Sequence, residues 1–394
     1  MKKLVSMLLA LCLVLGVTAA SAAVPAEEIK VGYICIGDEN EGYSANHING
    51  LKAAQEALGI SDDQVMIKYN IPETEAAYEA AVDLAENGCD IIFATSFGQE
   101  SYVFQAAAEY PDIQFCHATG TAASTSELTN VHNYFTAIYE ARYVSGVVAG
   151  MKLNQMIEDG TITAEAAKIG YVGAFPFAEV ISGYTSFFLG ARSVCPSATM
   201  EVRYTNSWSD MALEKETAEA LIADGCVLIS QHSDNTTPAT MAQSKGAFHT
   251  GYNNDMTGVA PDASIIGCRI DWTPYFVYAI ESVANGQEFD QDYCYGYDHG
   301  DVVLTELNEK IAAPGTAEKL AEVEAGLADG SIKVFDTSTF TVGGETLTSA
   351  FALDTDGDFT PDSEEAVFDG AFHESYFQSA PSFQLRIDGI TELN

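Results

Sequence analysis

Short apolar runs alternate with helical patterns along most of this chain, and that alternation limits the fold more than any other feature of the sequence. The first series has apolar runs at residues 30–37, 65–70, 90–97 and 113–120, and a helical pattern follows each of the first three. A second series of the same kind begins at Lys168. Strands in regular alternation with helices form parallel sheets flanked by helices. The predicted fold class is therefore α/β.

The two series also resemble each other. Residues 83–98 and 220–234 each contain a helix end, a Gly-Cys turn, an apolar strand and a polar strand exit, and the comparison aligns Cys89 with Cys226. A chain of about 370 mature residues exceeds what one hydrophobic core usually organises. We therefore expect two similar domains that face each other across a cleft, with residues 271–297 returning the chain to the first domain.

The loop at residues 38–54 indicates where a ligand binds. It follows the apolar run 31–36 and carries acids, an amide and an aromatic side chain where a short turn would connect strand to helix. In open parallel sheets, ligands bind at the carboxyl ends of the strands. The sequence thus predicts a ligand-binding loop at this strand end.

The N-terminus has the layout of a secretory signal peptide over residues 1–22. Two lysines precede an apolar run at residues 4–17, and an Ala-Ser-Ala cleavage motif follows it. Cys12 lies inside the apolar run and is preceded by a leucine where a lipoprotein motif needs Gly or Ala, so cleavage without lipidation is the prediction. We expect an exported protein, periplasmic or extracellular.

The mature chain is strongly acidic. Cleavage removes two of the 17 Lys and Arg residues and leaves 15 against 57 Asp and Glu residues, a formal net charge near −42. Such a field repels nucleic acid and anionic membrane surfaces, which excludes both as partners. It favours neutral or cationic ligands only weakly, because salt screens surface charge beyond roughly 10 Å.

Cleavage also leaves seven of the eight cysteines, so at least one thiol is free. No Cys-x-x-Cys pair is present, which argues against a zinc site or a redox motif. A disulfide between Cys195 and Cys226 is left open by the sequence.

Five segments in one order resemble the basic membrane protein (BMP) family of substrate-binding proteins, whose relatives include purine-nucleoside-binding lipoproteins of ABC transporters. The segments are residues 38–54, 137–150, 169–175, 205–225 and 269–272. The resemblance implies a type I periplasmic-binding fold, in which two doubly wound parallel-sheet domains are joined by three hinge crossovers and close on the ligand.

This fold implies a division of the mature chain into two lobes and an extension. The N-terminal lobe would comprise residues 24–130 plus 270–298, and the C-terminal lobe residues 131–269 plus 299–341. Residues 342–394 lie beyond most of the resemblance, and we expect them to form an extension packed on the second lobe.

The resemblance also implies ligand contacts. In the nucleoside binders, one aromatic side chain from each lobe sandwiches the base. Trp208 takes that place in the second lobe, and Tyr43 or Phe97 takes it in the first. The implied polar contacts are Asn40, His117, Asn253 and Arg269. Each also has a structural interpretation, such as core packing for Tyr43 and Phe97, or an ion pair with a carboxylate for Arg269.

Two of the polar positions differ from the nucleoside binders. His117 and Asn253 stand where those proteins carry aspartates that would hold ribose hydroxyls. A modified base, a sugar or another small polar metabolite therefore stays an alternative to a nucleoside.

An acidic stretch near the C-terminus partly matches a calcium-binding loop. Carboxylates occupy positions 1, 3, 5, 9 and 12 of the loop pattern, but Phe359 occupies position 6, where a glycine makes the sharp turn. A solvated turn is the preferred interpretation, and no metal is assigned. The candidate calcium ligands are Asp354, Asp356, Asp358, Asp362 and Glu365.

The function implied by the resemblance is capture of a small polar ligand, first of all a nucleoside, by lobe closure and its delivery to the permease of an ABC importer. The protein would then be a monomer without a cofactor, associated with the membrane through its permease. One alternative is a ligand-sensing partner of a membrane receptor. Another is a nucleoside- or glycoside-cleaving enzyme, although no nucleophile elbow, P-loop, HExxH or GxGxxG motif is present.

Overall fold

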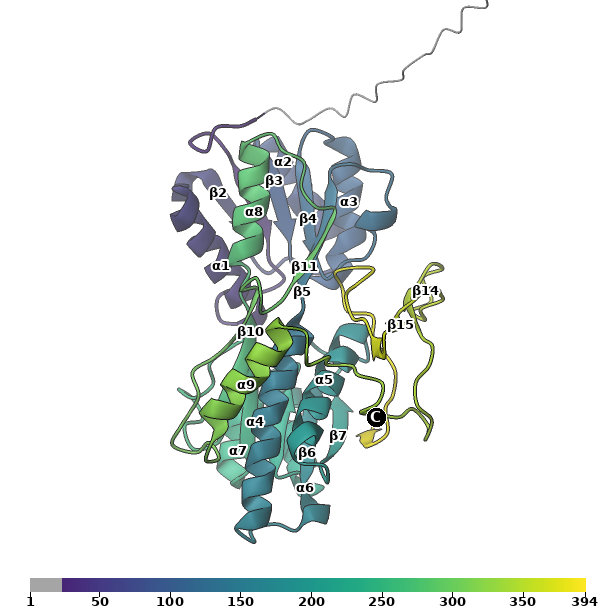
Figure 1. Cartoon of the computed structure of the whole chain (residues 1–394). Coiled ribbons are helices and arrows are strands. Elements are labelled where there is room, and N and C mark those ends of the chain that lie inside the picture. Colours follow the sequence, from purple (N-terminus) through teal and green to yellow (C-terminus); the bar gives the residue numbers. More distant parts are fainter. Residues whose placement is uncertain (1–22) are drawn as a thin grey trace, which may run out of the picture.

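Two parallel sheets with helices on both faces make up most of the computed structural model, which describes residues 23–394 (Figure 1). The predicted α/β class with two parallel-sheet lobes is confirmed. The predicted signal peptide at residues 1–22 lies outside the described residues. Within residues 23–394, no helix has the length and apolar character needed to cross a membrane.

The first lobe is built on a six-stranded sheet in the order β11-β5-β4-β3-β1-β2, and all neighbouring strands are parallel. Strands β1 and β3 are buried along their whole length, as expected for a parallel sheet covered on both faces. The strands are β1 (Val31–Ile34), β2 (Val65–Lys68), β3 (Ile91–Ala94), β4 (Gln114–Ala118), β5 (Val131–Thr136) and β11 (Asp292–Tyr295).

Helices α1 and α8 pack with one face of this sheet, and α2 and α3 pack with the other. The loop singled out in the sequence leads into α1, whose first turn is capped by Glu41 through bonds from the amides of Tyr43 and Ser44. Gly59 ends the helix in the left-handed conformation, with φ of 69°. The helices are α1 (Gly42–Leu58), α2 (Glu75–Glu86), α3 (Glu100–Glu109) and α8 (Thr273–Ala284).

The second lobe has a seven-stranded sheet in the order β12-β10-β9-β8-β6-β7-β17. Neighbouring strands of this sheet are parallel except for β10 and β12, which are antiparallel. The strands are β6 (Lys168–Gly173), β7 (Thr199–Tyr204), β8 (Leu228–Gln231), β9 (Phe248–Tyr252), β10 (Ser264–Ile270), β12 (Val302–Leu304) and β17 (Ile390–Glu392).

Helices cover both faces of the second sheet as well. The core on one face contains α4, α5 and α9, and the core on the other contains α6 and α7. These helices are α4 (Ile138–Glu158), α5 (Ala178–Val194), α6 (Met211–Ala223), α7 (Thr237–Lys245) and α9 (Thr316–Ala328).

The chain passes between the lobes three times, between β5 and α4, between β10 and α8, and between β11 and β12. One predicted boundary is wrong in detail. Residues 131–136 were assigned to the second lobe, but they form β5 and pair with β4 in the first sheet. Residues 131–136 are fully buried and form the strand β5. The chain therefore crosses to the second lobe only after Thr136. The other boundaries stay a prediction.

The C-terminal segment, residues 333–394, runs beside both lobes (Figure 1). Strand β17 pairs with β7, and the Glu392 carboxylate accepts the hydroxyls of Tyr184 and Tyr204, each at 2.6 Å. The segment also reaches the first lobe, because the amide of Ser379 donates to Asp292 Oδ2 of β11 at 2.8 Å. It is therefore fixed to the second lobe and bonded to the first. Its other strands are short, β13 (Phe351–Leu353), β14 (Ser363–Glu365), β15 (Val367–Phe368) and β16 (Ala371–Phe372).

Every cysteine in the described part of the chain is a free thiol. The disulfide between Cys195 and Cys226 that the sequence left open is therefore not formed. Burial raises the pKa of the Cys226 thiol to about 12, with a further contribution from Glu201. These side chains act as small apolar groups in the core.

Helices α4 and α5 approach each other closely through two glycines. A Cβ atom at Gly146 would overlap the carbonyl oxygen of Phe187, and one at Gly190 would overlap that of Tyr143. Because both obstacles are backbone atoms, a methyl group at either position forces the helices apart.

We expect Gly146→Ala to lower the free energy of unfolding by about 1–3 kcal/mol, the usual cost of overpacking a core. Urea unfolding followed by circular dichroism measures this change. Gly258→Ala is the matched control, because a Cβ there meets no atom within 4 Å, and it should stay within about 0.5 kcal/mol of the parent. Equal stability of both variants would contradict the close approach.

Candidate functional site

A cavity lies between the lobes at the carboxyl ends of their strands, and we call it the inner chamber. Residues after β1, β3 and β4 form one wall, and residues after β6, β7 and β8 form the other, as the parallel topology requires. From the first lobe the lining comprises Ile36, Tyr43, Thr95, Ser96, Phe97 and Thr119. From the second it comprises Glu179, Trp208, His232, Asp234 and Tyr252. The volume is about 40 Å³.

A larger cavity of about 300 Å³ adjoins the inner chamber, and we call it the outer chamber. The two chambers share Phe97, Thr119, Glu179 and Trp208 as lining residues. The rest of the outer wall comes from Thr121, from residues 176–178 and from the C-terminal segment. The two cavities therefore form one continuous site with a narrow inner end.

The structure brings the three predicted aromatic residues to the inner chamber. Trp208 lies in the loop after β7, its ring centroid 5.1 Å from that of Phe175 and 6.1 Å from that of Phe177. Phe97 of the first lobe lies 5.7 Å from Phe177, so aromatic rings meet across the lobe junction. Tyr43 is held in place because its hydroxyl donates to the carbonyl of Thr95 at 2.7 Å. Their contact with a ligand stays a prediction.

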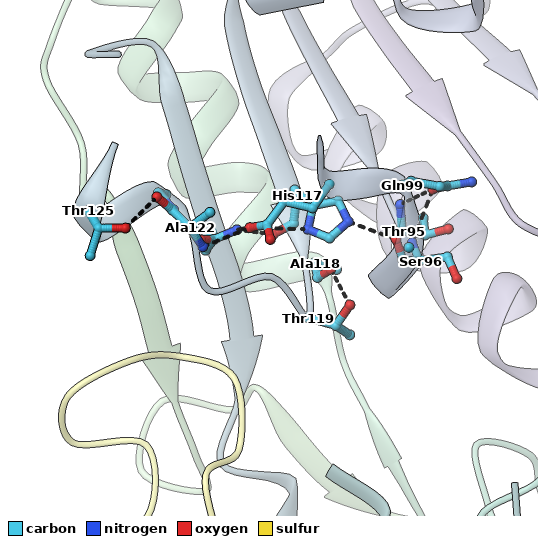
Figure 2. Close-up of polar contacts among 12 residues, drawn as sticks. Thr95, Ser96, Gln99, His117, Ala118, Thr119, Ala122 and Thr125 are labelled. Atoms are coloured by element: carbon cyan, nitrogen blue, oxygen red, sulfur yellow. Dashed lines mark hydrogen bonds and ion pairs between the residues drawn. The ribbon is translucent and has the colours of Figure 1, made fainter. Parts of the chain in front are cut away.

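His117 lies behind the chamber wall and does not line it. Its ring is buried, and Nε2 is 2.7 Å from the carbonyl oxygen of Ser96 (Figure 2). Nδ1 faces Glu100 at 4.0 Å. Burial lowers the pKa of His117, against the opposing charge of Glu100. In this conformation His117 supports the loop of Thr95 and Ser96, where the sequence comparison predicted a direct ligand contact.

Asn40 also lies away from both chambers. Its side chain is exposed, and its amide nitrogen donates to Asp38 Oδ1 at 2.9 Å. The sequence places Asn40 in the loop after β1 but does not determine the direction of its side chain. Its position in the loop was therefore not enough to predict a ligand contact.

Asn253 joins the two lobes beside the inner chamber. Its amide donates to Asp234 Oδ1 at 3.1 Å, and its carbonyl oxygen accepts from Asn46 of α1 at 2.9 Å. Asn253 has φ of 63°, a left-handed conformation that Asn adopts more readily than most residues. Gly42 of the first lobe likewise donates its amide to the carbonyl of Asp234 at 3.3 Å. These bonds hold the lobes together in the closed arrangement.

Arg269 points elsewhere than predicted. Its side chain is 38% exposed, and Nη2 lies 3.8 Å from Asp271 Oδ2, which matches the ion-pair alternative. No lysine or arginine is among the residues that line the inner or the outer chamber in the described structure.

Two carboxylates that the sequence comparison did not single out line the inner chamber. Glu179 Oε1 lies 3.1 Å from Nε2 of His232. Burial, with the charges of Glu41 and Glu214, raises the pKa of Asp234 well above its ordinary value. The sequence did contain a signal for Asp234. It lies in the polar stretch that follows β8, and the internal repeat aligns this stretch with the polar stretch that follows β3.

A buried cation lies behind this wall. The guanidinium of Arg142 is 3.5 Å from the ring centroid of Tyr252, and Nη1 donates to the carbonyl of Gln231 at 2.7 Å. Burial first, and then the charge of Arg142, lowers the pKa of His232 to about 4, although Glu179 opposes this shift. The inner chamber thus presents a neutral imidazole and a carboxylate to any ligand.

The structure brings together three of the five candidate calcium ligands. Asp354, Asp356 and Asp358 each place one carboxylate oxygen within 4.8 Å of the others, on the exposed surface. The other two are engaged with protein groups, since Asp362 accepts from the hydroxyl of Thr355 and Glu365 from that of Ser349. The calcium site stays an alternative to a solvated turn.

The low pKa of His232 predicts that its ring stays neutral through pH 5. Because the pKa in the folded protein lies below the ordinary value of about 6.5, protonation favours the unfolded chain. The stabilising effect of the neutral ring is complete above about pH 6.5 and is lost as the pH falls to about 4. An NMR titration of the His232 ring, assigned with His232→Gln, should give a midpoint near 4. A midpoint above 6 would contradict the buried geometry.

Several known proteins resemble this chain in sequence. A family model described as ABC transporter substrate-binding protein PnrA-like (Bmp) matches residues 36–332. A purine-binding protein of Brucella abortus is 33% identical over 324 residues, which cover 82% of this chain and 87% of that protein. A putative ABC transporter glucose-binding protein of Haloferax volcanii is 30% identical over 315 residues, 80% of this chain and 76% of that protein.

Solved structures agree on the fold. An ABC transporter solute-binding protein from Aeropyrum pernix has a TM-score of 0.63 at 18% identity, and the match covers 78% of this chain and 93% of that one. One from Conexibacter woesei has a TM-score of 0.60 at 20% identity, with 77% and 98% covered. The predicted periplasmic-binding fold and the family resemblance are both confirmed. The chain belongs to the Bmp family of ABC transporter substrate-binding proteins.

Proposed function

We propose that this substrate-binding protein captures an uncharged nucleoside between its lobes and presents it to the permease of an ABC importer. The observation that carries the proposal is the composition of the chambers, where aromatic rings from both lobes meet and carboxylates are present without a lining lysine or arginine. The relative of Brucella abortus, with 33% identity, is named as a purine-binding protein, and a purine is the base of a purine nucleoside.

Stacking supplies affinity in this site. Trp208, Tyr43 and Phe97 line the inner chamber with aromatic rings, and stacking a base on one aromatic side chain contributes roughly 1–3 kcal/mol. Nucleoside bases have the flat faces that such walls favour. The hydroxyls of Thr95 and Ser96 are already engaged, with the amide of Ile36 and the carboxylate of Glu73. Tyr252 also lines the inner chamber, and its buried hydroxyl has no hydrogen-bond partner in the described part of the chain, so it is available for a bond to the ligand.

Charge supplies selectivity. Glu179 lines the inner chamber, and the carboxyl of Asp234 lies beside it. A phosphate placed there would meet negative charge, and removing it from water would not be offset by a lining cation. We therefore expect nucleosides to bind and nucleotides to be excluded.

Capture requires movement of the lobes. A cavity of about 40 Å³ has room for only about three waters, so a base cannot enter while the bonds of Asn46 with Asn253 and of Gly42 with Asp234 persist. The lobes must part to admit the ligand and then close around it, with an inner chamber wider than in this structure. The ligand shifts this equilibrium only by its differential affinity for the closed state.

The ligand should leave unchanged, and the protein should act as an exported carrier. Under this proposal the permease recognises the closed lobes. A sugar is the second candidate ligand, because the relative of Haloferax volcanii is named as a putative glucose-binding protein. Release of free base from bound adenosine, followed by chromatography, would instead indicate an enzyme.

A thermal-shift screen of the mature protein tests the ligand class. Adenosine at 100 times its dissociation constant should add about 2.7 kcal/mol to the stability, whereas AMP at the same concentration should add almost nothing. Stabilisation by glucose and not by any nucleoside would overturn the nucleoside assignment and keep the carrier.

Trp208→Ala should weaken nucleoside binding tenfold to a hundredfold, about 1.4–2.8 kcal/mol, because one stacking wall is lost. Isothermal titration calorimetry measures the dissociation constant. Met211→Ala is the control, since this nearby side chain is 62% exposed and lines neither chamber. Unchanged affinity in the Trp208 variant would remove that residue from the site.

A further inference from the structure

The outer chamber has a wall that lies outside the family match. The family model ends at residue 332, and the C-terminal segment that follows contributes about half of the lining. This wall combines apolar rings with amide groups. Its main side chains are Phe359, Pro361, Pro381, Gln378 and Gln384.

Phe359 is the most exposed aromatic side chain of this wall, at 65%. Its backbone has φ of 66°, a left-handed conformation that is costly for a bulky residue. Core packing does not offset this cost, because the ring is largely uncovered. Its centroid lies 6.4 Å from that of Phe177 with an interplanar angle of 23°.

Two hydrogen bonds hold Phe359 in this position. Its amide donates to Asp354 Oδ2 at 2.7 Å, and its carbonyl oxygen accepts from the side-chain amide of Gln384 at 2.9 Å. A strained, exposed ring held against the mouth of a cavity is typical of a ligand contact.

The wall is anchored at both ends of the segment. Phe383 packs on Phe335 with centroids 4.4 Å apart, and β17 completes the second sheet. Glu374 is buried and accepts the amides of Ser382 and Phe383, which fixes the turn that contributes Pro381. The outer chamber therefore has rigid sides and is not a gap beneath a loose tail.

We propose that the outer chamber is a second binding subsite, in which the C-terminal segment holds an additional uncharged ring of the ligand against Phe359 and Phe177. The inner chamber takes the first ring, and the shared residues Trp208 and Phe97 lie between the two. The second subsite extends the proposed function, and it rests on that function for the binding of the first ring in the inner chamber.

The lining defines the chemical class of the second ring. Phe359, Phe177 and the two prolines suit the face of a sugar or a heteroaromatic ring. The amide nitrogens of Gln384 and Gln378 already donate to the carbonyls of Phe359 and Ala380, so their side-chain carbonyl oxygens are what they offer to a hydroxyl or an N–H of the ligand. Asp354 and Glu179 are the lining carboxylates, so a phosphate or carboxylate on the second ring is excluded. The ligand is thus a substituted nucleoside or a two-ring glycoside.

The experiment compares matched ligands that differ by one uncharged ring. Adenosine is paired with its N6-benzyl and 5′-benzylthio derivatives, and glucose is paired with maltose. Dissociation constants are measured by calorimetry for the parent protein, Phe359→Ala and Tyr376→Ala. Tyr376 is the matched control, because it belongs to the same segment, is 67% exposed and does not line the chamber. Thermal melting checks that both variants fold.

At least one ligand with the added ring should bind about tenfold more tightly than its parent. Phe359→Ala should abolish that gain and leave the affinity for the parent ligand within twofold, and Tyr376→Ala should change neither. No gain in either pair, or a gain that survives Phe359→Ala, would overturn the subsite even if adenosine binds. A gain with maltose that Phe359→Ala abolishes, without adenosine binding, would keep the subsite and overturn the nucleoside assignment.

Discussion

The direction of the strands determines where this protein can bind anything. Both sheets are parallel except at β12, and the chain passes between them after β5, β10 and β11, so each lobe turns the carboxyl ends of its parallel strands toward the other. Loops from both lobes therefore meet at one place, and the lining of the inner chamber follows almost entirely from that arrangement. The place of the candidate site is a consequence of topology before any side chain is considered.

Side chains then give this site its chemical character. Rings from both lobes make the walls apolar and flat, while Glu179 and Asp234 make the inner end acidic. Arg142 lies behind Tyr252 and offsets part of this charge without reaching the chamber. Under the proposed function, such a site selects first by shape and then by the absence of negative charge on the ligand. The buried, unpartnered hydroxyl of Tyr252 is then one group that can discriminate among nucleosides.

Much of this architecture was predictable from periodicity. The apolar runs 30–37 and 90–97 become β1 and β3, and the aromatic residues in the loops after strands, Tyr43, Phe97 and Trp208, do line the inner chamber. Strand ends are easy to locate in a sequence, because apolar runs stop there and polar residues follow.

Side-chain direction at those ends was not predictable. Asn40 lies in a loop, which fixes no inside and outside, and its side chain turns to Asp38. Arg269 lies at the end of β10, and its long side chain turns toward Asp271, which follows the strand. His232 and Asp234 were not predicted to line the chamber for the same reason, although they directly follow β8. The C-terminal segment has short strands and little periodicity, so its position beside the chambers depends on contacts with residues far away in sequence, such as Glu392 with Tyr184.

The bond from Ser379 to Asp292 links the C-terminal segment to the first lobe, while β17 belongs to the second. Separation of the lobes must break this bond as well as those at Asn253 and Asp234. This bond adds to the stability of the closed arrangement, so opening of the lobes for entry or for exit of a ligand has to break it. A protein held closed in this way would exchange its ligand slowly and keep it for longer.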